Sequence, residues 1–239
     1  MKIFKRKKEI RLYLRGFILL FCTAVGGYGI FTAPESDQSI LEHELQQNQQ
    51  TLQQINLTTE AQAKIVDEET DAPIKKGLKA KLSKQEDTIS VIGDSVFLGA
   101  APSFKKIQKN AIIDAKISRQ VYHALDVAKE LKKKGKLGHT VLIALGINGP
   151  FSQSTGQALL DYLGKDRTIY WINAYGRGVT WQKDVNQTIQ KLVKKNPNLY
   201  LISWAKEAKK HPDWFYQDGT HLNTKGQEGF SRFIKKNIN

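Results

Sequence analysis

From residue 88 onward, short runs of β-branched and other apolar residues alternate with longer amphipathic stretches. The short runs, bounded by turn-forming residues, predict buried strands, and the longer stretches predict helices with one apolar face. The expected strands are residues 89–92, 111–115, 141–145, 169–173 and 199–203, and the expected helices are residues 96–109, 120–134, 154–163, 181–196 and 224–237.

Strands that alternate regularly with helices predict an α/β domain over residues 88–239, with a parallel sheet covered on both faces. Five expected strands correspond to a flavodoxin-like three-layer sandwich. In such folds, ligands bind at the carboxyl ends of the strands. Polar residues that follow the expected strands are therefore the first candidates for a functional site.

Residues 1–33 have a different pattern, with seven basic side chains followed by eighteen uncharged residues at 16–33. A helix of that length spans about 27 Å, which is enough to cross a bilayer core. Basic residues on its N-terminal side indicate a cytoplasmic N-terminus and an extracellular remainder. A removed signal peptide is the alternative, which the bulky Phe31 and the following Pro34 disfavour. We expect a single-pass anchor.

Residues 34–87 form a third zone, rich in Gln and Glu, which we interpret as an extracellular stalk and linker. One set of positions follows the 4-3-4-3 spacing of a coiled coil. Two heptads leave two alternatives open, a solvated and partly helical stalk or a dimerisation coil. The spaced positions are Leu41, Leu45, Asn48, Leu52 and Ile55, and a Lys-rich linker follows Pro73.

The composition narrows the class of protein further. A single cysteine excludes an internal disulfide, and the three zones carry net charges of +6, −5 and +13 within a total of +14. A strongly basic domain is typical of nucleic-acid binding, but an extracellular location replaces that partner with anionic wall polymers. No His or Cys spacing indicates zinc, and no phosphate-binding glycine loop is present. We expect neither a metal nor a cofactor, and no nucleic acid as partner.

The first expected strand ends in Gly93-Asp94-Ser95, directly before a helix. A serine at such a turn exposes its hydroxyl, and its backbone N–H lies at a helix N-terminus that can receive an oxyanion. Capping of the helix is the alternative role for Ser95, because serine does this routinely.

Two further strand ends, and the segment before the last helix, carry candidate groups. Asn148 follows the third strand and could donate a hydrogen bond to charge that develops near Ser95. Ser118 follows the second strand, where its backbone N–H could face the same crevice. Asp218 and His221 precede the last helix, and an acid three residues from an imidazole can orient that ring to accept a proton from a serine.

The order Ser, Asn, Asp, His along successive strand ends resembles the SGNH (GDSL-type) hydrolase superfamily. More narrowly, the domain is similar to the extracellular catalytic domain of Gram-positive peptidoglycan O-acetyltransferases. The stretches that carry the resemblance are VIGDSVFLGAAP, DAKISRQ, ALGINGPFS, TWQKDVN and DGTHLNTKG. The resemblance implies a Ser95 nucleophile, a His221 base and an Asp218 that orients it. It also implies an oxyanion hole made of the Ser95 and Ser118 N–H groups and the Asn148 side chain.

The implied reaction is transfer of an acetyl group, through an acyl-enzyme, to the muramic acid C6 hydroxyl of peptidoglycan. Hydrolysis by a carbohydrate esterase and non-enzymatic wall binding are the alternatives. Weaker candidates for substrate binding are Gly146, Tyr175 and Trp181. Two departures from the family stand out. Ser118 replaces the usual Gly, and a single anchor replaces a multi-pass acyltransferase domain, so a separate membrane protein is expected to supply the acetyl group.

Overall fold

The computed structural model describes residues 36–68 and 88–238. The expected anchor at residues 1–33 and the linker after Pro73 lie outside these ranges. Within the ranges, no helix has both the length and the apolar character that a bilayer crossing requires. The described residues from Leu41 onward belong to one compact unit.

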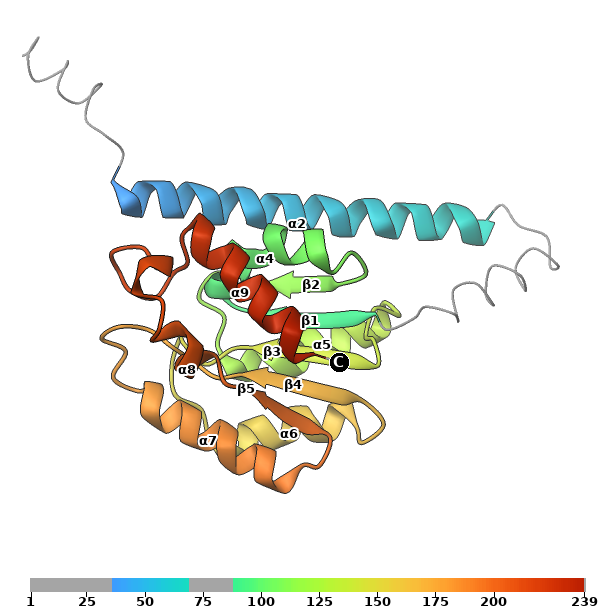
Figure 1. The fold of residues 1–239 in the computed structure, drawn as a ribbon. Coiled ribbons are helices and arrows are strands. Elements are labelled where there is room, and N and C mark those ends of the chain that lie inside the picture. The colour runs from blue at the N-terminus through green and yellow to red at the C-terminus, as the bar shows by residue number, and fades with distance from the viewer. Residues whose placement is uncertain (1–35, 69–87, 239) are drawn as a thin grey trace, which may run out of the picture. The chain divides into compact units, whose positions relative to one another are not determined.

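The core of this unit is a five-stranded, all-parallel sheet (Figure 1). Its strand order, β2-β1-β3-β4-β5, is that of a flavodoxin-like fold, and the chain reverses its direction of winding between β1 and β3. The five expected strands are confirmed, each to within a few residues. They are β1 (Ile89–Gly93), β2 (Ile112–Ala115), β3 (Thr140–Ala144), β4 (Thr168–Ile172) and β5 (Leu199–Ile202).

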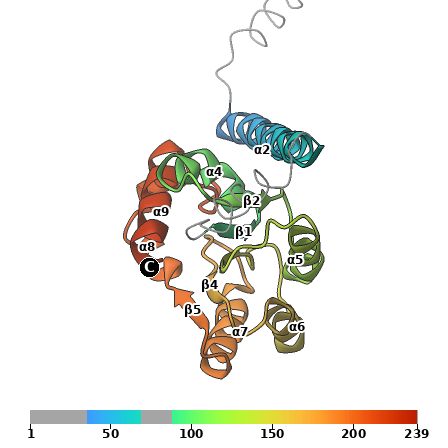
Figure 2. The same ribbon diagram turned by 90° about the vertical axis from the view of Figure 1, so that its right-hand side faces the viewer.

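Helices cover both faces of the sheet (Figure 2). One face carries α4 (Ser95–Ile107) and α9 (Thr224–Asn237), and the other carries α5 (Ala124–Lys133), α6 (Gln153–Leu163) and α7 (Gln182–Lys195). The expected helix at residues 120–134 begins with a separate 3₁₀ turn instead. Three short elements were not predicted from the sequence, namely η1 (Val121–His123), α8 (Trp204–Ala208) and η2 (Pro212–Trp214).

The hydrophobic core explains why these segments form these elements. All five residues of β1 and of β3 are buried, because helices cover both of their faces. On the α4 face, the Phe97 ring meets the Phe104 and Phe230 rings edge-on at 5.3 and 6.0 Å. Each fully buried aromatic side chain removes a large apolar area from water, so this cluster fixes α4, and the serine at its start, against the sheet.

Helix α2 (Asp37–Glu68) contains the spaced apolar positions that raised the coiled-coil alternative. Leu41 and Leu45 are 8% and 5% exposed and belong to the same hydrophobic core as the sheet. Leu52 packs against this core, and the Asn48 side chain donates to the Leu98 carbonyl of α4 at 3.3 Å. In the described structure, four of the five spaced side chains therefore contact the chain's own domain, and the fifth, Ile55, is 42% exposed.

Candidate active site

Ser95 is held at the junction of β1 and α4. Asp94 caps α4, and its carboxylate accepts a hydrogen bond from the Val96 backbone N–H at 3.0 Å. Ser95 is then the first helical residue, so its own backbone N–H lies at the N-terminus of the helix. The partial positive charge of that helix end favours an anion beside the serine.

The loop between η2 and α9 carries Asp218 and His221 and is closed like a small hairpin. Phe215 and Leu222 form an antiparallel bridge, and the Tyr216 N–H donates to the His221 carbonyl at 2.9 Å. Between them, Gly219 has a φ of 63°, which an L side chain adopts only with strain. This tight turn brings the acid and the imidazole to the same side of the loop.

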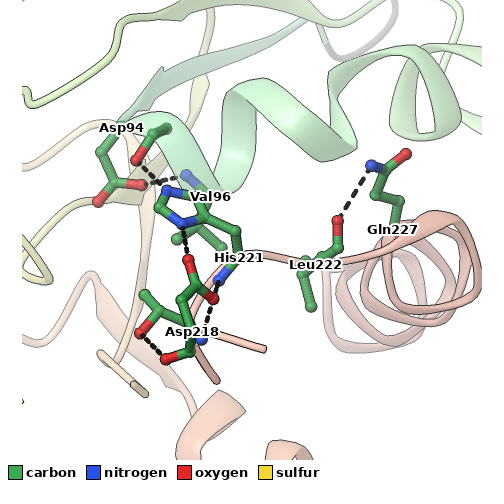
Figure 3. Close-up of polar contacts among 8 residues, drawn as sticks. Asp94, Val96, Asp218, His221, Leu222 and Gln227 are labelled. Carbon is green, nitrogen blue, oxygen red and sulfur yellow. Dashed lines mark hydrogen bonds and ion pairs between the residues drawn. The ribbon is translucent and has the colours of Figure 1, made fainter. Parts of the chain in front are cut away.

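One carboxylate fixes the conformation of this loop from inside. Asp218 Oδ1 accepts from the backbone N–H groups of Thr220 and His221 at 2.8 and 2.9 Å. Its Oδ2 lies 2.6 Å from His221 Nδ1 (Figure 3). Burial acts to raise the pKa of Asp218, but the hydrogen bonds from His221 and from the backbone outweigh it and hold the pKa below its ordinary value. Asp218 is therefore ionised at neutral pH.

An ionised Asp218 determines which nitrogen of His221 carries the proton. Since the carboxylate only accepts hydrogen bonds, the proton lies on Nδ1, and Nε2 has a free lone pair. His221 Nε2 lies 2.9 Å from Ser95 Oγ. The structure thus brings Ser95, His221 and Asp218 into one chain of hydrogen bonds, with the serine hydroxyl as the donor to Nε2.

On the other side of Ser95, the loop after β2 presents Ser118. This residue has a φ of 57°, and it is the non-glycine residue with positive φ among those described. The left-handed conformation costs an L residue about 1–2 kcal/mol relative to the right-handed one. A glycine would adopt it without that cost.

Arg119 fixes the same loop and was missed in the sequence analysis. Its side chain is almost completely buried, and Nη2 pairs with Asp114 Oδ1 at 2.6 Å. Nη1 donates to the Gly93 carbonyl at 3.1 Å and to the Asp114 carbonyl at 2.5 Å. The guanidinium therefore connects the loop after β2 to the end of β1, two residues before Ser95. The sequence did contain a signal for this pair, because the acid Asp114 near the end of an expected strand is followed five residues later by Arg119.

Asn148 lies in the loop after β3, beside the loop of Arg119. Its Nδ2 donates to the Arg119 carbonyl at 3.2 Å, which leaves a second N–H of the same amide group for another acceptor. Two indole N–H groups hold this loop, since Trp171 donates to the Leu145 carbonyl at 3.1 Å and Trp181 to the Ile147 carbonyl at 3.0 Å.

The weaker candidates for substrate binding are all placed near these loops. Gly146 has a φ of 136°, and a Cβ there would lie 2.8 Å from Val185, so the position requires glycine for the loop conformation itself. Tyr175 is half-buried, with its ring 5.2 Å from that of Phe215. Trp181 is also half-buried and packs against the core.

Asp94 is the buried acid of the site. Burial raises its pKa to about 7, against the opposing effects of the Val96 and Phe97 backbone N–H groups and of Arg119. The surroundings explain the direction, because Asp94 borders a pocket of about 30 Å³ with mainly apolar walls, including Leu145, Ile172 and Phe230. In the described ranges, no group of three or more His, Cys, Asp or Glu residues is arranged to hold a metal ion.

Comparison of the sequence with known proteins gives peptidoglycan O-acetyltransferases among its relatives. The peptidoglycan O-acetyltransferase OatA of Listeria monocytogenes is 34% identical over 173 residues, 72% of this chain and 27% of that protein. The O-acetyltransferase OatA of Staphylococcus aureus is 33% identical over 149 residues, 62% of this chain and 24% of that protein. The chain thus spans about a quarter of the length of these relatives. No protein-family model matches the chain.

Solved structures show the same fold. The C-terminal catalytic domain of Streptococcus pneumoniae peptidoglycan O-acetyltransferase A superposes with a TM-score of 0.57 at 23% identity, over 63% of this chain and 91% of that domain. A family 3 carbohydrate esterase from Talaromyces cellulolyticus gives a TM-score of 0.50 at 13% identity, over 62% and 94%.

In fold and site, the domain resembles the SGNH-type (GDSL-type) hydrolases. Its parallel sheet, the serine that opens α4 and the histidine hydrogen-bonded to that serine are the features that carry this conclusion. Among proteins with this fold, the chain resembles the catalytic domain of the peptidoglycan O-acetyltransferases.

Proposed function

We propose that the protein is a serine-dependent O-acyltransferase that moves an acetyl group to a hydroxyl of a cell-wall glycan, the C6 hydroxyl of muramic acid in peptidoglycan. The observation that carries the proposal is the hydrogen-bonded chain from Ser95 Oγ through His221 to Asp218, at 2.9 and 2.6 Å. The sequence similarity to peptidoglycan O-acetyltransferases supports the choice of acyl group and acceptor.

In the first step, Ser95 Oγ attacks the carbonyl carbon of the acyl donor, and its proton passes to His221 Nε2. The ionised Asp218 stabilises the imidazolium that forms. Negative charge develops on the former carbonyl oxygen, where the Ser95 and Ser118 N–H groups and the Asn148 amide can donate to it. The carbon–oxygen bond to the donor then breaks, the leaving oxygen takes the proton from His221, and an acetyl-serine remains.

In the second step, the glycan hydroxyl takes the place of the departed donor. His221 Nε2 accepts the proton of this hydroxyl as its oxygen attacks the acetyl carbon of the acyl-enzyme. The same three donors stabilise the second oxyanion, and the proton returns from His221 to Ser95 as the ester bond breaks. The products are the acetylated glycan and the free serine.

The proposal includes the place of the reaction and its partners. Residues 1–33 would anchor the chain as a single-pass helix with a cytoplasmic N-terminus, residues 34–87 would connect it, and residues 88–239 would act outside the membrane of a Gram-positive bacterium. The acetyl donor would reach the outside through a separate membrane acyltransferase.

Hydrolysis is the second candidate, and the exposure of the site favours it. The Asp218 side chain is 40% exposed and that of His221 is 23% exposed, so water has access to the proposed base. If water is the acceptor, the same residues release acetate and the protein is a carbohydrate esterase. Exclusion of water by bound glycan would decide between the two reactions.

The test is turnover of a chromogenic acetyl ester by the full-length chain in detergent, with and without a chito-oligosaccharide acceptor. The full chain is used because Leu41 and Leu45 belong to the core, so a domain cut at residue 88 would lose part of it. Ser95→Ala should abolish turnover above background. Ser154→Ala, an exposed serine on α6, is the matched control and should leave turnover unchanged.

The product identifies the reaction. Acetylated oligosaccharide that depends on Ser95 supports the transferase, whereas free acetate alone supports the esterase. Equal turnover by the wild type and Ser95→Ala would contradict both and leave the wall-binding alternative, for which pelleting with purified peptidoglycan is the measurement.

A further inference from the structure

Glu44 lies on the face of α2 that contacts the core. It is half-buried and stands between the buried Leu41 and Leu45 in sequence. A carboxylate in such a position needs hydrogen-bond donors, because the loss of hydration would otherwise disfavour its charge. Both of its oxygens have donors, and both donors come from the neighbourhood of the loop that carries Asp218 and His221.

The first donor is the hydroxyl of Tyr216, which lies 3.0 Å from Glu44 Oε2. The second is the side-chain amide of Gln227, with Nε2 at 2.5 Å from Glu44 Oε1. Gln227 is buried in the first half of α9, which limits the positions that its amide can adopt. Hydrogen bonds to an ionised acceptor are stronger than those between neutral groups.

These two donors hold opposite ends of the catalytic loop. Tyr216 precedes the turn, and its backbone N–H donates to the His221 carbonyl at 2.9 Å. On the other side, Gln227 Nε2 also donates to the carbonyl of Leu222, the residue after His221, at 3.1 Å (Figure 3). One carboxylate on α2 therefore connects, through one intermediate residue each, to both flanks of the segment from Asp218 to His221.

We propose that Glu44 is a positioning residue for the reaction, and that α2 thereby contributes to the geometry of the active site. The proposal rests on the proposed function of His221 as the base. The Asp218 hydrogen bonds fix the ring within its loop, but they are internal to that loop. Glu44 fixes the loop against the domain that carries Ser95, and so sets the distance between His221 Nε2 and the serine hydroxyl.

The decisive variant is Glu44→Gln, which keeps the size of the side chain. Tyr216 and Gln227 donate to different oxygens of Glu44, and in the amide one of these two positions becomes an NH2 group that donates instead of accepting. If Gln227 turns its oxygen toward the new amide, it releases the Leu222 carbonyl. We expect kcat for the acetyl ester to fall between about tenfold and a hundredfold with KM unchanged, because a small misplacement of the base slows the chemical step.

Glu42→Gln is the matched control, with the same change of charge on an exposed residue of the same helix. It should leave kcat and KM as in the wild type. Tyr216→Phe, alone and combined with Glu44→Gln, adds a coupling measurement. If both residues act through one connection, the double variant should lose less than the product of the two single losses.

Amide hydrogen exchange tests positioning without turnover. The backbone N–H groups of Thr220 and His221 donate to Asp218 and should exchange faster in Glu44→Gln than in Glu42→Gln or the wild type. Equal exchange and equal kcat in the two Glu variants would overturn the proposal. If the wild type itself shows no turnover, the proposed function fails, and the exchange comparison alone then supports or overturns the positioning role.

Discussion

The two sides of Ser95 are built in different ways. On one side, Asp218 and His221 lie three residues apart, and the hydrogen bonds that orient them are mostly within that short loop. On the other side, Ser118 and Asn148 follow different strands and are brought together by Arg119 and by two indole N–H groups. The first side is a local structure within one loop, and the second joins two loops through the buried side chain of Arg119, although Ser118 itself is exposed.

This difference separates two kinds of contribution to the proposed reaction. In the proposed reaction the Asp218–His221 pair accepts and returns protons. Its contribution therefore depends on which atom carries the proton, and each position relies on one side chain. The proposed oxyanion side, made of the Ser95 and Ser118 N–H groups and the Asn148 amide, would contribute donors with fixed directions, two of which belong to the backbone. We therefore expect substitutions on the acid–base side to have larger effects than those on the oxyanion side.

The largest effect is expected for Asp218→Asn. The amide keeps the shape but can donate to His221 Nδ1, which favours the proton on Nε2 and removes the acceptor for the Ser95 hydroxyl. Catalysis should fall about 10⁴-fold in kcat, the cost of the same change in well-studied triads. Steady-state turnover of the chromogenic acetyl ester measures it.

Asp213→Asn is the control for Asp218→Asn, since Asp213 is an exposed acid that pairs with Lys225 nearby. Its activity should equal that of the wild type. A loss below about tenfold in Asp218→Asn would mean that Asp218 does not orient the base, and the contrast between the two sides would disappear.

On the oxyanion side, Asn148→Ala should lower kcat about 10²- to 10³-fold, the cost of losing one donor to an oxyanion. Asn148→Asp removes the donor while keeping the shape, and should lose at least as much activity. Both variants should retain the KM of the wild type if the donor acts only on developing charge. An active Asn148→Asp would show that the donor is not needed.

Asp94 directly precedes Ser95, and its raised pKa can be tested through the pH dependence of the free energy of unfolding. A carboxyl group whose pKa is raised from 3.8 to about 7 in the folded state binds its proton more tightly there. Its stabilising contribution is complete below about pH 4 and is lost as the pH rises to about 7. Between pH 5 and pH 8 this loss is about 3 kcal/mol.

Asp94→Asn is the variant for this test, because asparagine also caps helices well and does not ionise. Urea unfolding followed by tryptophan fluorescence at pH 5 and pH 8 gives the free energy of unfolding for both proteins. The wild type should lose more stability than Asp94→Asn over this interval. Parallel pH dependence in the two proteins would contradict a buried, protonated Asp94.

The contrast between contacts within one segment and contacts between distant segments also explains which features the sequence could predict. The strands and the covering helices follow from apolar patterns within single segments, and Asp218 and His221 are close enough in sequence for their pairing to be expected. Glu44 acts through side chains 172 and 183 residues away in the sequence, with no pattern to mark it. For Arg119 the nearby Asp114 was a local signal, but its contact with the Gly93 carbonyl was not. Similarly, the apolar spacing of α2 predicts a helix with one buried face, but not which surface covers it.

The smallest expected effect concerns Ser118, a non-glycine residue in the loop after β2 whose positive φ is unfavourable for an L side chain. Ser118→Gly removes the cost of a positive φ and should raise the free energy of unfolding by about 1 kcal/mol, after allowing for the greater freedom of glycine in the unfolded chain. The backbone N–H remains, so kcat should stay within about twofold of the wild type. Ser118→Ala keeps the strain but removes the hydroxyl, and should gain no stability. If Ser118→Ala is as stable as Ser118→Gly, the hydroxyl and not the backbone conformation is the source of the cost in stability. A large loss of kcat in either variant would mean that the serine side chain itself takes part in the site.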